Sequence, residues 1–298
     1  MRVGAIVPVH GDGRYLGEAL RGLLEQDHPP EEVVVVDDAS REPIRLPRET
    51  PGNVRLIRRD ERGGPAAARD TGLAELDADW IALADDDDVW EPGKLESQRR
   101  VAAGDAAVVY GTALVIDAEG TPTGEIAVRG SQLSGQAFVD GLFVTNFIPA
   151  SSALIRRSAL DAVGGFARAP HELAEDWDLW FRLIRAGERF VFDPTARIRY
   201  RRHEGGLTQD VERLAEAGLL VHERHAALVS PELAEYVKSR DLASLARGKI
   251  RRRDWKGARA AFKESAKLYE QPRRDRVTRT VAAVPGLRKR LGRRNSYR

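Results

Sequence analysis

The sequence contains no cysteine among its 298 residues. No disulfide can therefore stabilise the chain, and no thiolate is available as a nucleophile or a zinc ligand. We expect a protein of the reducing cytoplasm. No apolar run approaches the ~20 residues that a membrane-spanning helix needs. The apolar run at residues 3–9 contains Pro8 and meets a polar loop too early to form a signal-peptide core, so we expect neither export nor membrane insertion.

Two common nucleotide-binding motifs are also missing. The sequence has no GxxxxGK[ST], the loop in which backbone amides and a lysine cradle phosphates. Gly11, Asp12 and Gly13 do not complete the GxGxxG pattern, which argues against a nicotinamide dehydrogenase. Apolar residues nevertheless make up 42% of the chain, enough for a folded core.

Charge is distributed unevenly along the chain. The overall net charge is +2, but residues 247–298 contain 19 Lys or Arg and only 4 Asp or Glu. This stretch therefore carries a net charge of +15, which leaves −13 for residues 1–246. We expect the two parts to face different partners.

The first hundred residues alternate between strand and helix patterns. Apolar runs rich in β-branched residues predict strands at 3–9, 32–38, 53–59 and 78–84, and helical spacing of apolar residues predicts helices at 15–26 and 65–76. Near-continuous apolar strands imply burial on both faces, so we expect an α/β fold with a parallel sheet covered by helices on each side.

The rest of the chain is less regular. It predicts a helix at 91–102, a strand at 106–116, a loop at 120–135 that could include a strand, and a strand at 150–157. It also predicts helices at 158–166 and 171–187, and strands at 188–194 and 196–202. Beyond Gln209 almost everything is predicted to be helical, including one helix pair of the tetratricopeptide kind without a second copy.

Polar residues follow three of the predicted strands. Pro8, Val9 and His10 end the first, Asp37 and Asp38 end the second, and the run Asp85–Asp88 follows the fourth. In open α/β sheets ligands bind at the carboxyl ends of the strands, so we expect these loops to converge. An isolated acidic loop is usually only solvated, but adjacent carboxylates without basic neighbours suit Mg²⁺ or Mn²⁺ bridging to substrate phosphates.

A second acidic cluster lies on the predicted helix at 171–187 and comprises Glu172, Glu175, Asp176 and Asp178. Asp176 in a first helical turn could be a dipole cap. Alternatively, a carboxylate beside a charged substrate can be tuned to remove a proton from a hydroxyl near neutral pH.

Seven motifs in order between Val3 and Thr208 resemble the family 2 inverting glycosyltransferases. They are PVH, VVVVDDAS, GGPAAARDTGL, WIALADDDDVWEPGKLESQ, SSALIRRSALDAVGGF, EDWDLWFRL and YRRHEGGLT. The resemblance implies the GT-A fold, a Rossmann-like and mostly parallel sheet with helices on both faces. A GT-A domain would span 1–208, with a nucleotide-binding half at 1–103 and an acceptor-binding half at 104–208. A basic α-helical C-terminal region would follow at 209–298.

The resemblance also implies residue roles on the nucleotide side. Pro8, Val9 and His10 would border the base-binding pocket, and Asp38 would hydrogen-bond the pyrimidine edge. Arg69 would lie close to the nucleotide.

The implied catalytic roles fall in three later motifs. Asp85 and Asp87 match the metal-motif pair, with Asp87 the direct ligand of Mn²⁺ or Mg²⁺, and Asp86 occupies a variable position that can reach the ribose. Asp176 matches the general base. His203 matches a position that approaches the metal or diphosphate in some members, although a lone histidine is more often structural.

We therefore expect an inverting, metal-dependent transfer of one sugar from a UDP- or dTDP-sugar to a hydroxyl acceptor, in cell-surface polysaccharide or glycoconjugate synthesis. The sequence has no QxxRW motif, which argues against a processive synthase. A sugar-1-phosphate nucleotidyltransferase would need a GxGTR-like loop after the first strand, which PVHGDGRYL does not supply. A catalytically silent nucleotide-sugar-binding scaffold would be expected to lack the metal motif or the base.

The basic C-terminal region suggests an additional partner. A charge run is usually a solvated face, but this one is too one-sided for a mixed surface. We expect contact with an anionic membrane at the inner face of the cell membrane, where a lipid-linked acceptor would lie. Nucleic acid is a weaker alternative, because few aromatic residues are available to stack on bases.

Overall fold

The computed structural model describes residues 1–128, 132–166, 173–206 and 210–269. The chain forms two compact units, one made of Met1–Ser134 and Thr145–Glu204, the other of Gly135–Val144 and Gly205–Arg298. The expected boundary between residues 208 and 209 lies outside the described residues, as does most of the arginine-rich end at 270–298.

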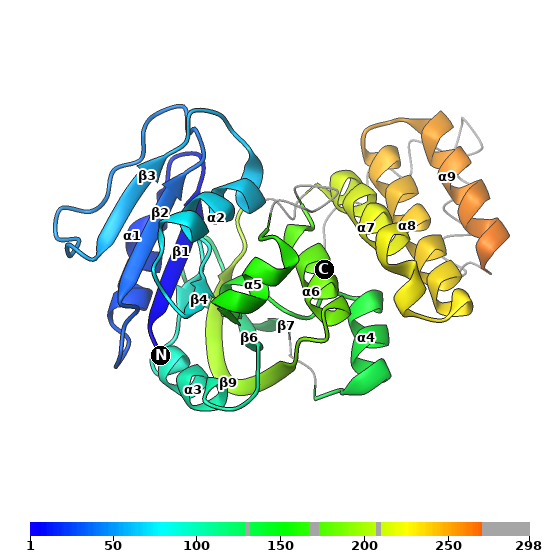
Figure 1. Ribbon diagram of the computed structural model, residues 1–298. Helices are drawn as coiled ribbons and strands as arrows, with labels where there is room; N and C mark the ends of the chain where they lie inside the picture. Colours follow the sequence, from blue (N-terminus) through cyan, green and yellow to red (C-terminus); the bar gives the residue numbers. More distant parts are fainter. Residues whose placement is uncertain (129–131, 167–172, 207–209, 270–298) are drawn as a thin grey trace. The chain divides into compact units, whose positions relative to one another are not determined.

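The first unit is built on a sheet that has nine strands among the described residues (Figure 1). The strands are β1 (Val3–Val9), β2 (Glu32–Asp37), β3 (Val54–Arg58), β4 (Trp80–Leu83), β5 (Val89–Trp90), β6 (Val108–Ile116), β7 (Pro122–Val128), β8 (Leu154–Arg156) and β9 (Phe190–Arg201). Their order is β3-β2-β1-β4-β8-β6-β9-β5, and β7 pairs with β6. The α/β fold is confirmed.

Strands β1 to β4 form the parallel half of this sheet, as predicted. Helix α1 (Leu16–Leu24) connects β1 to β2, and helix α2 (Gly64–Glu75) connects β3 to β4. Leu20 and other apolar residues of α1 pack in one core cluster with the odd-numbered residues of β1. Gly72 of α2 lies against Ile6, where an added Cβ would stand 2.6 Å from a methyl group. Helices thus cover both faces, and every residue of β1 is buried.

The other half of the sheet is mixed. β8 runs antiparallel to β4 and β6, and β9 runs parallel to β6 and antiparallel to β5. Around it lie α3 (Lys94–Ala102), α5 (Arg157–Val163) and α6 (Glu175–Arg185). Residues 171–172 of the helix predicted at 171–187 are outside the described residues.

The two strands predicted at 188–194 and 196–202 are one strand, β9. Its pairing with β6 shifts register between Tyr110 and Thr112, which absorbs the interruption that Pro194 signals in the sequence. Gly111 lies at this shift, where an added Cβ would stand 1.6 Å from the carbonyl oxygen of Ala196. The backbones therefore approach too closely for any side chain at position 111.

The second unit is helical in its described part. It contains α4 (Gly135–Val144), α7 (Val211–His225), α8 (Pro231–Arg251) and α9 (Trp255–Leu268). Ser230 caps α8, with proline following at the first helical position, and Asp254 caps α9 by accepting from the amide of Gly257 at 2.8 Å. None of the described helices combines the length and apolarity needed to cross a bilayer.

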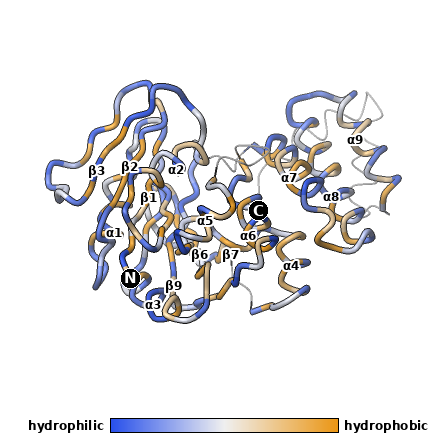
Figure 2. The backbone as a smooth tube through the Cα atoms, viewed as in Figure 1, coloured by the Kyte–Doolittle hydropathy of each residue, from blue (hydrophilic) through white to orange (hydrophobic). Residues whose placement is uncertain are grey.

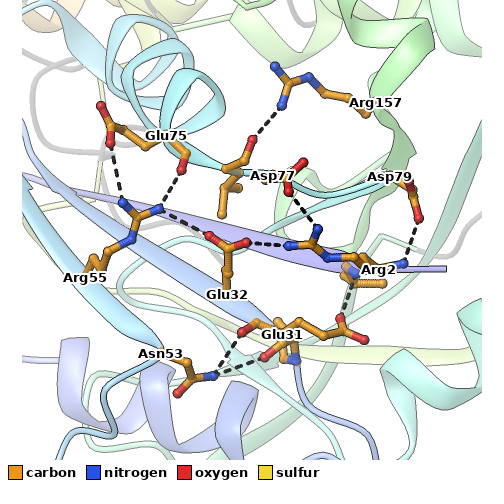
Figure 3. Close-up of polar contacts among 12 residues, drawn as sticks. Arg2, Glu31, Glu32, Asn53, Arg55, Glu75, Asp77, Asp79 and Arg157 are labelled. Atoms are coloured by element: carbon orange, nitrogen blue, oxygen red, sulfur yellow. Dashed lines mark hydrogen bonds and ion pairs between the residues drawn. The ribbon is translucent and has the colours of Figure 1, made fainter.

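Ion pairs gather at the amino ends of the parallel strands (Figure 3). Arg2 contacts Asp77 at 2.7 Å and Glu32 at 3.0 Å, and Arg55 contacts Glu32 at 3.2 Å and Glu75 at 3.5 Å. These pairs are largely solvent-exposed, so each contributes ~1 kcal/mol or less. They tie strand ends together on the edge opposite the predicted ligand site.

Candidate active site

The loops that follow β1 and β2 lie in contact. The His10 ring nitrogen Nδ1 lies 2.9 Å from the carbonyl oxygen of Asp38, and the amide of Gly11 donates to Ser40 Oγ at 3.1 Å. Pro8 and Val9 are buried at the end of β1, while His10 is exposed. The structure therefore brings these two predicted polar loops together at the carboxyl edge of the sheet.

Asp38 organises the next loop along this edge. Its carboxylate accepts hydrogen bonds from the amides of Gly63 at 3.0 Å and Gly64 at 2.7 Å, where α2 begins, and lies 3.4 Å from Arg59 Nε. The side chain is only 4% exposed. In this structure Asp38 therefore fixes the start of the helix that carries Arg69.

The four aspartates between β4 and β5 have different surroundings. Asp88 is buried and accepts the Arg201 amide at 3.1 Å, so it joins the run to β9. Asp85 and Asp87 keep exposed fractions of 32% and 28%. Burial, followed by the charges of Asp87 and Asp85, raises the pKa of Asp86 well above its ordinary value. The run concentrates negative charge that a cation would relieve.

Asp87 faces His203, which follows β9. Asp87 Oδ2 lies 3.0 Å from His203 Nε2, and the histidine ring packs against Tyr15 at 5.1 Å between centroids. Burial and then Asp85 raise the pKa of Asp87, whereas the contact with His203 lowers it. Among the described residues no three His, Asp or Glu side chains lie close enough together to hold a metal ion by themselves. This oxygen and imidazole pair is a donor set that Mn²⁺ accepts.

Arg69 connects the aspartate run to the acidic helix. This buried guanidinium donates to Asp85 Oδ1 at 2.6 Å and to Glu175 Oε1 at 2.5 Å. Burial lowers the pKa of Arg69, but the two carboxylates outweigh burial and the net shift is upward. The bridge joins α2, the loop after β4 and α6, which are far apart in the sequence.

Asp176 stands beside this bridge in the first turn of α6. Its Oδ1 accepts a hydrogen bond from the backbone amide of Trp177, the next residue of the turn, at 2.7 Å, and its Oδ2 accepts one from Asn146 Nδ2 at 2.9 Å. Burial and the neighbouring Glu175 carboxylate raise the pKa of Asp176 to about 7, although Arg69 and both hydrogen bonds oppose the rise. A carboxyl group with this pKa can exchange a proton near neutral pH.

Four buried residues support the backbone of the aspartate run, and we call them the brace: Trp90, Lys94, Gln98 and Ser151. Ser151 accepts the amide of Asp85 on its Oγ at 2.9 Å and the indole of Trp90 on its carbonyl at 3.0 Å. Lys94 Nζ lies 3.7 Å from the Trp90 ring centroid and donates to Gln98 at 2.9 Å. Burial lowers the pKa of Lys94 well below its ordinary value. The brace fixes the backbone at the first aspartate.

The structure thus joins the predicted residues into three connected groups. His10 contacts Asp38, Asp87 contacts His203, and Asp85 reaches the neighbour of Asp176 through Arg69. The sequence interpretation missed Asn146, whose segment carried no motif, and Ser151, which was assigned to a strand. It also missed the roles of Arg201 and Asp88. Arg201 and Arg202 directly precede His203 in the sequence, and this pair of arginines could have pointed to the role of Arg201.

The mixed α/β sheet, with carboxylates at the carboxyl ends of its parallel strands, has the GT-A fold. The family model described as "Glycosyl transferase family 2" matches residues 5–164. The chain belongs to glycosyl transferase family 2.

Curated relatives support this assignment. The pre-mycofactocin glycosyltransferase of Mycobacterium tuberculosis is 31% identical over 205 residues, which cover 66% of this chain and 42% of that protein. An uncharacterized glycosyltransferase of Rickettsia felis is 26% identical over 213 residues, covering 67% of this chain and 34% of that protein. The matches span less than half the length of these two relatives.

Solved structures confirm the fold. The mannosyltransferase PcManGT of Pyrobaculum calidifontis, in complex with GDP-Man and Mn²⁺, superposes with a TM-score of 0.58 at 19% identity, covering 99% of this chain and 88% of that one. S. aureus TarS 1–349, in complex with UDP-GlcNAc, gives a TM-score of 0.59 at 17% identity, covering 90% of each chain.

Proposed function

We propose that this protein transfers a single sugar from a UDP- or dTDP-sugar to a hydroxyl acceptor with inversion at the anomeric carbon. The observation that carries the proposal is the Arg69 bridge, because it couples Asp85 of the aspartate run to the acidic pair Glu175 and Asp176. A donor-side group and an acceptor-side base would then belong to one site.

Asp176 would act as the general base. Its carboxylate would take the proton of the acceptor hydroxyl while that oxygen attacks the anomeric carbon from the face opposite the leaving group. One carbon–oxygen bond forms as the bond to the diphosphate breaks, so a single displacement inverts the configuration. The pKa of about 7 means that roughly half of the base is ionised near neutral pH.

The donor side supplies charge stabilisation. Asp87, with His203 beside it, would hold Mn²⁺ or Mg²⁺, and the positive charge of that ion would stabilise a nucleoside diphosphate leaving group. Pro8, Val9, His10 and Asp38 would line the base pocket, and Asp86 would lie near the ribose. Arg69 keeps Asp85 in place between the two sides.

The two alternative functions have less support. A nucleotidyltransferase needs a glycine-rich loop after the first strand, and the loop here is instead anchored by the contacts of His10 and Gly11 with residues 38 and 40. A silent scaffold would need no base, yet Asp176 is held by two hydrogen bonds and has a pKa suited to proton transfer.

A panel of nucleotide sugars tests the reaction and its donor. The protein is incubated with Mn²⁺ and UDP-, dTDP- or GDP-sugars, and the release of nucleoside diphosphate is measured together with the anomeric configuration of the product. We expect turnover of a UDP- or dTDP-sugar with inversion, and a loss of ~10²–10⁴-fold in Asp176→Asn. A retained configuration, or full activity of that variant, would contradict the mechanism.

The nature of the acceptor is inferred from the chemistry of the proposed reaction. A hydroxyl is the group that a carboxylate base such as Asp176 would deprotonate. A role in cell-surface polysaccharide or glycoconjugate synthesis would place this acceptor on a lipid carrier. The basic C-terminal region would hold the enzyme peripherally at the anionic inner face of the membrane.

A further inference from the structure

Helix α9 carries four exposed cations in a single row. Lys256, Arg259, Lys263 and Lys267 are all exposed and follow one another at intervals of three, four and four residues. With 3.6 residues per turn, these intervals keep all four side chains on one face of the helix. We call this row the α9 stripe.

The opposite face of α9 is fixed to α8. Ala258 and Phe262 are fully buried in a small core shared with Ala246. Ser265 Oγ donates to the carbonyl of Ser239 at 2.7 Å. Figure 2 shows the resulting alternation of hydrophilic and hydrophobic stretches along α9. The stripe is therefore presented by a packed helix.

Positive charge on the stripe is poorly compensated. Glu264 is the one acidic residue of α9, and it contacts Lys267 at 2.8 Å. Within the described part of the chain, neither Lys256 nor Arg259 forms an ion pair. Residues 251–268 together contain seven Lys or Arg and two Asp or Glu. A row of positive charges this close together attracts a surface that carries many negative charges.

We propose that the α9 stripe is a contact surface for a bilayer of anionic lipids. A lipid surface suits a row of long, solvated side chains because it offers many headgroup charges in one plane, and each added Lys or Arg strengthens binding about fivefold. Nucleic acid is less suited, because the stripe has no aromatic side chain between its cations to stack on bases. The proposal deepens the peripheral contact proposed above by naming its residues.

Vesicle co-sedimentation with the full chain tests the stripe. Wild type and the triple variant Lys256→Gln/Arg259→Gln/Lys263→Gln are titrated with vesicles of phosphatidylcholine alone and of phosphatidylcholine with about 30% phosphatidylglycerol, at 0.15 M salt. The triple variant is expected to bind the anionic vesicles about a hundredfold more weakly than wild type. Contributions from other charges multiply both affinities equally, so the ratio isolates the stripe.

A matched control separates the stripe from net charge. Arg41, Arg45 and Arg48 are exposed in the loop between β2 and β3, and their conversion to Gln removes the same three charges. This control is expected to bind like wild type, and circular dichroism checks that both variants fold. The proposal is overturned if both triple variants weaken equally or if the α9 variant binds like wild type. It is also overturned if wild type does not prefer anionic vesicles, or prefers duplex or single-stranded DNA to them. No donor or metal is present, so the outcome is independent of sugar transfer.

Discussion

Asn146 holds the proposed base, and removing its amide should move the pH dependence of activity. Asn146 Nδ2 donates to Asp176 Oδ2 at 2.9 Å, and this bond favours the ionised carboxylate. In Asn146→Ala the amide of Trp177 remains as the other donor. The pKa of Asp176 should therefore rise above its value of about 7.

The size of the effect follows from the hydrogen bond. A bond from a neutral donor to a charged acceptor contributes about 1.5–3 kcal/mol, and water replaces part of it at this partly exposed carboxylate. A net loss of ~1.4 kcal/mol would raise the pKa by about one pH unit. Near pH 7 the ionised fraction would fall from about one half to about one tenth, which lowers kcat/KM roughly fivefold. Above pH 9 the variant and wild type should converge.

The assay is kcat/KM for the donor identified by the panel, measured from pH 5 to pH 10. Activity of wild type should decline as the pH falls below about 7, because the base must be deprotonated. Asn53→Ala is the matched control, because the Asn53 amide bonds the carbonyls of Pro30 and Glu31 at the other edge of the sheet. A pH profile of Asn146→Ala that superimposes on wild type, or a uniform loss at every pH, would refute the reasoning.

Two predictions concern stability and are measured by urea unfolding. Arg69→Met leaves buried Glu175 without its partner and should lower the free energy of unfolding by about 3–5 kcal/mol. The control Arg55→Met, at the exposed amino edge, should lower it by under ~1 kcal/mol. Equal losses in the two variants would contradict a stabilising role of the buried bridge. Gly111→Ala forces β6 away from β9 and should cost about 3 kcal/mol or more. Gly104→Ala, whose Cβ meets only an ordinary contact at 3.5 Å, is its control, and an unchanged unfolding midpoint for Gly111→Ala would contradict the close approach.

The parallel half of the fold could be predicted because its signals are local. Val3–Val9 and Glu32–Asp37 are continuous apolar runs, and one helix-spaced segment separates them. β5 escaped prediction because two residues give no periodicity, and its pairing with β9 depends on residues more than a hundred positions away. The break at Pro194 suggested two strands, because the register shift that absorbs it belongs to the partner strand.

The candidate site shows the same division. The Asp85–Asp88 run and the Glu175–Asp176 pair could be predicted as site residues because adjacent acidic residues are recognisable in the sequence itself. Their connection through Arg69 could not be derived from spacing, because it spans 106 residues between Arg69 and Glu175. Asn146 lies outside every motif, and Ser151 begins the SSALIRRSALDAVGGF motif without an assigned role, because an amide and a hydroxyl become part of a site only through what they contact.

The central claim is that Asp87 belongs to a cation-dependent site for the nucleoside diphosphate. Isothermal titration of UDP and dTDP into the protein, with and without Mn²⁺, measures this directly. We predict that Mn²⁺ strengthens binding at least tenfold in wild type and that Asp87→Ala abolishes this dependence while the protein stays folded. Binding that is indifferent to Mn²⁺ in wild type, or undiminished in Asp87→Ala, would contradict the account.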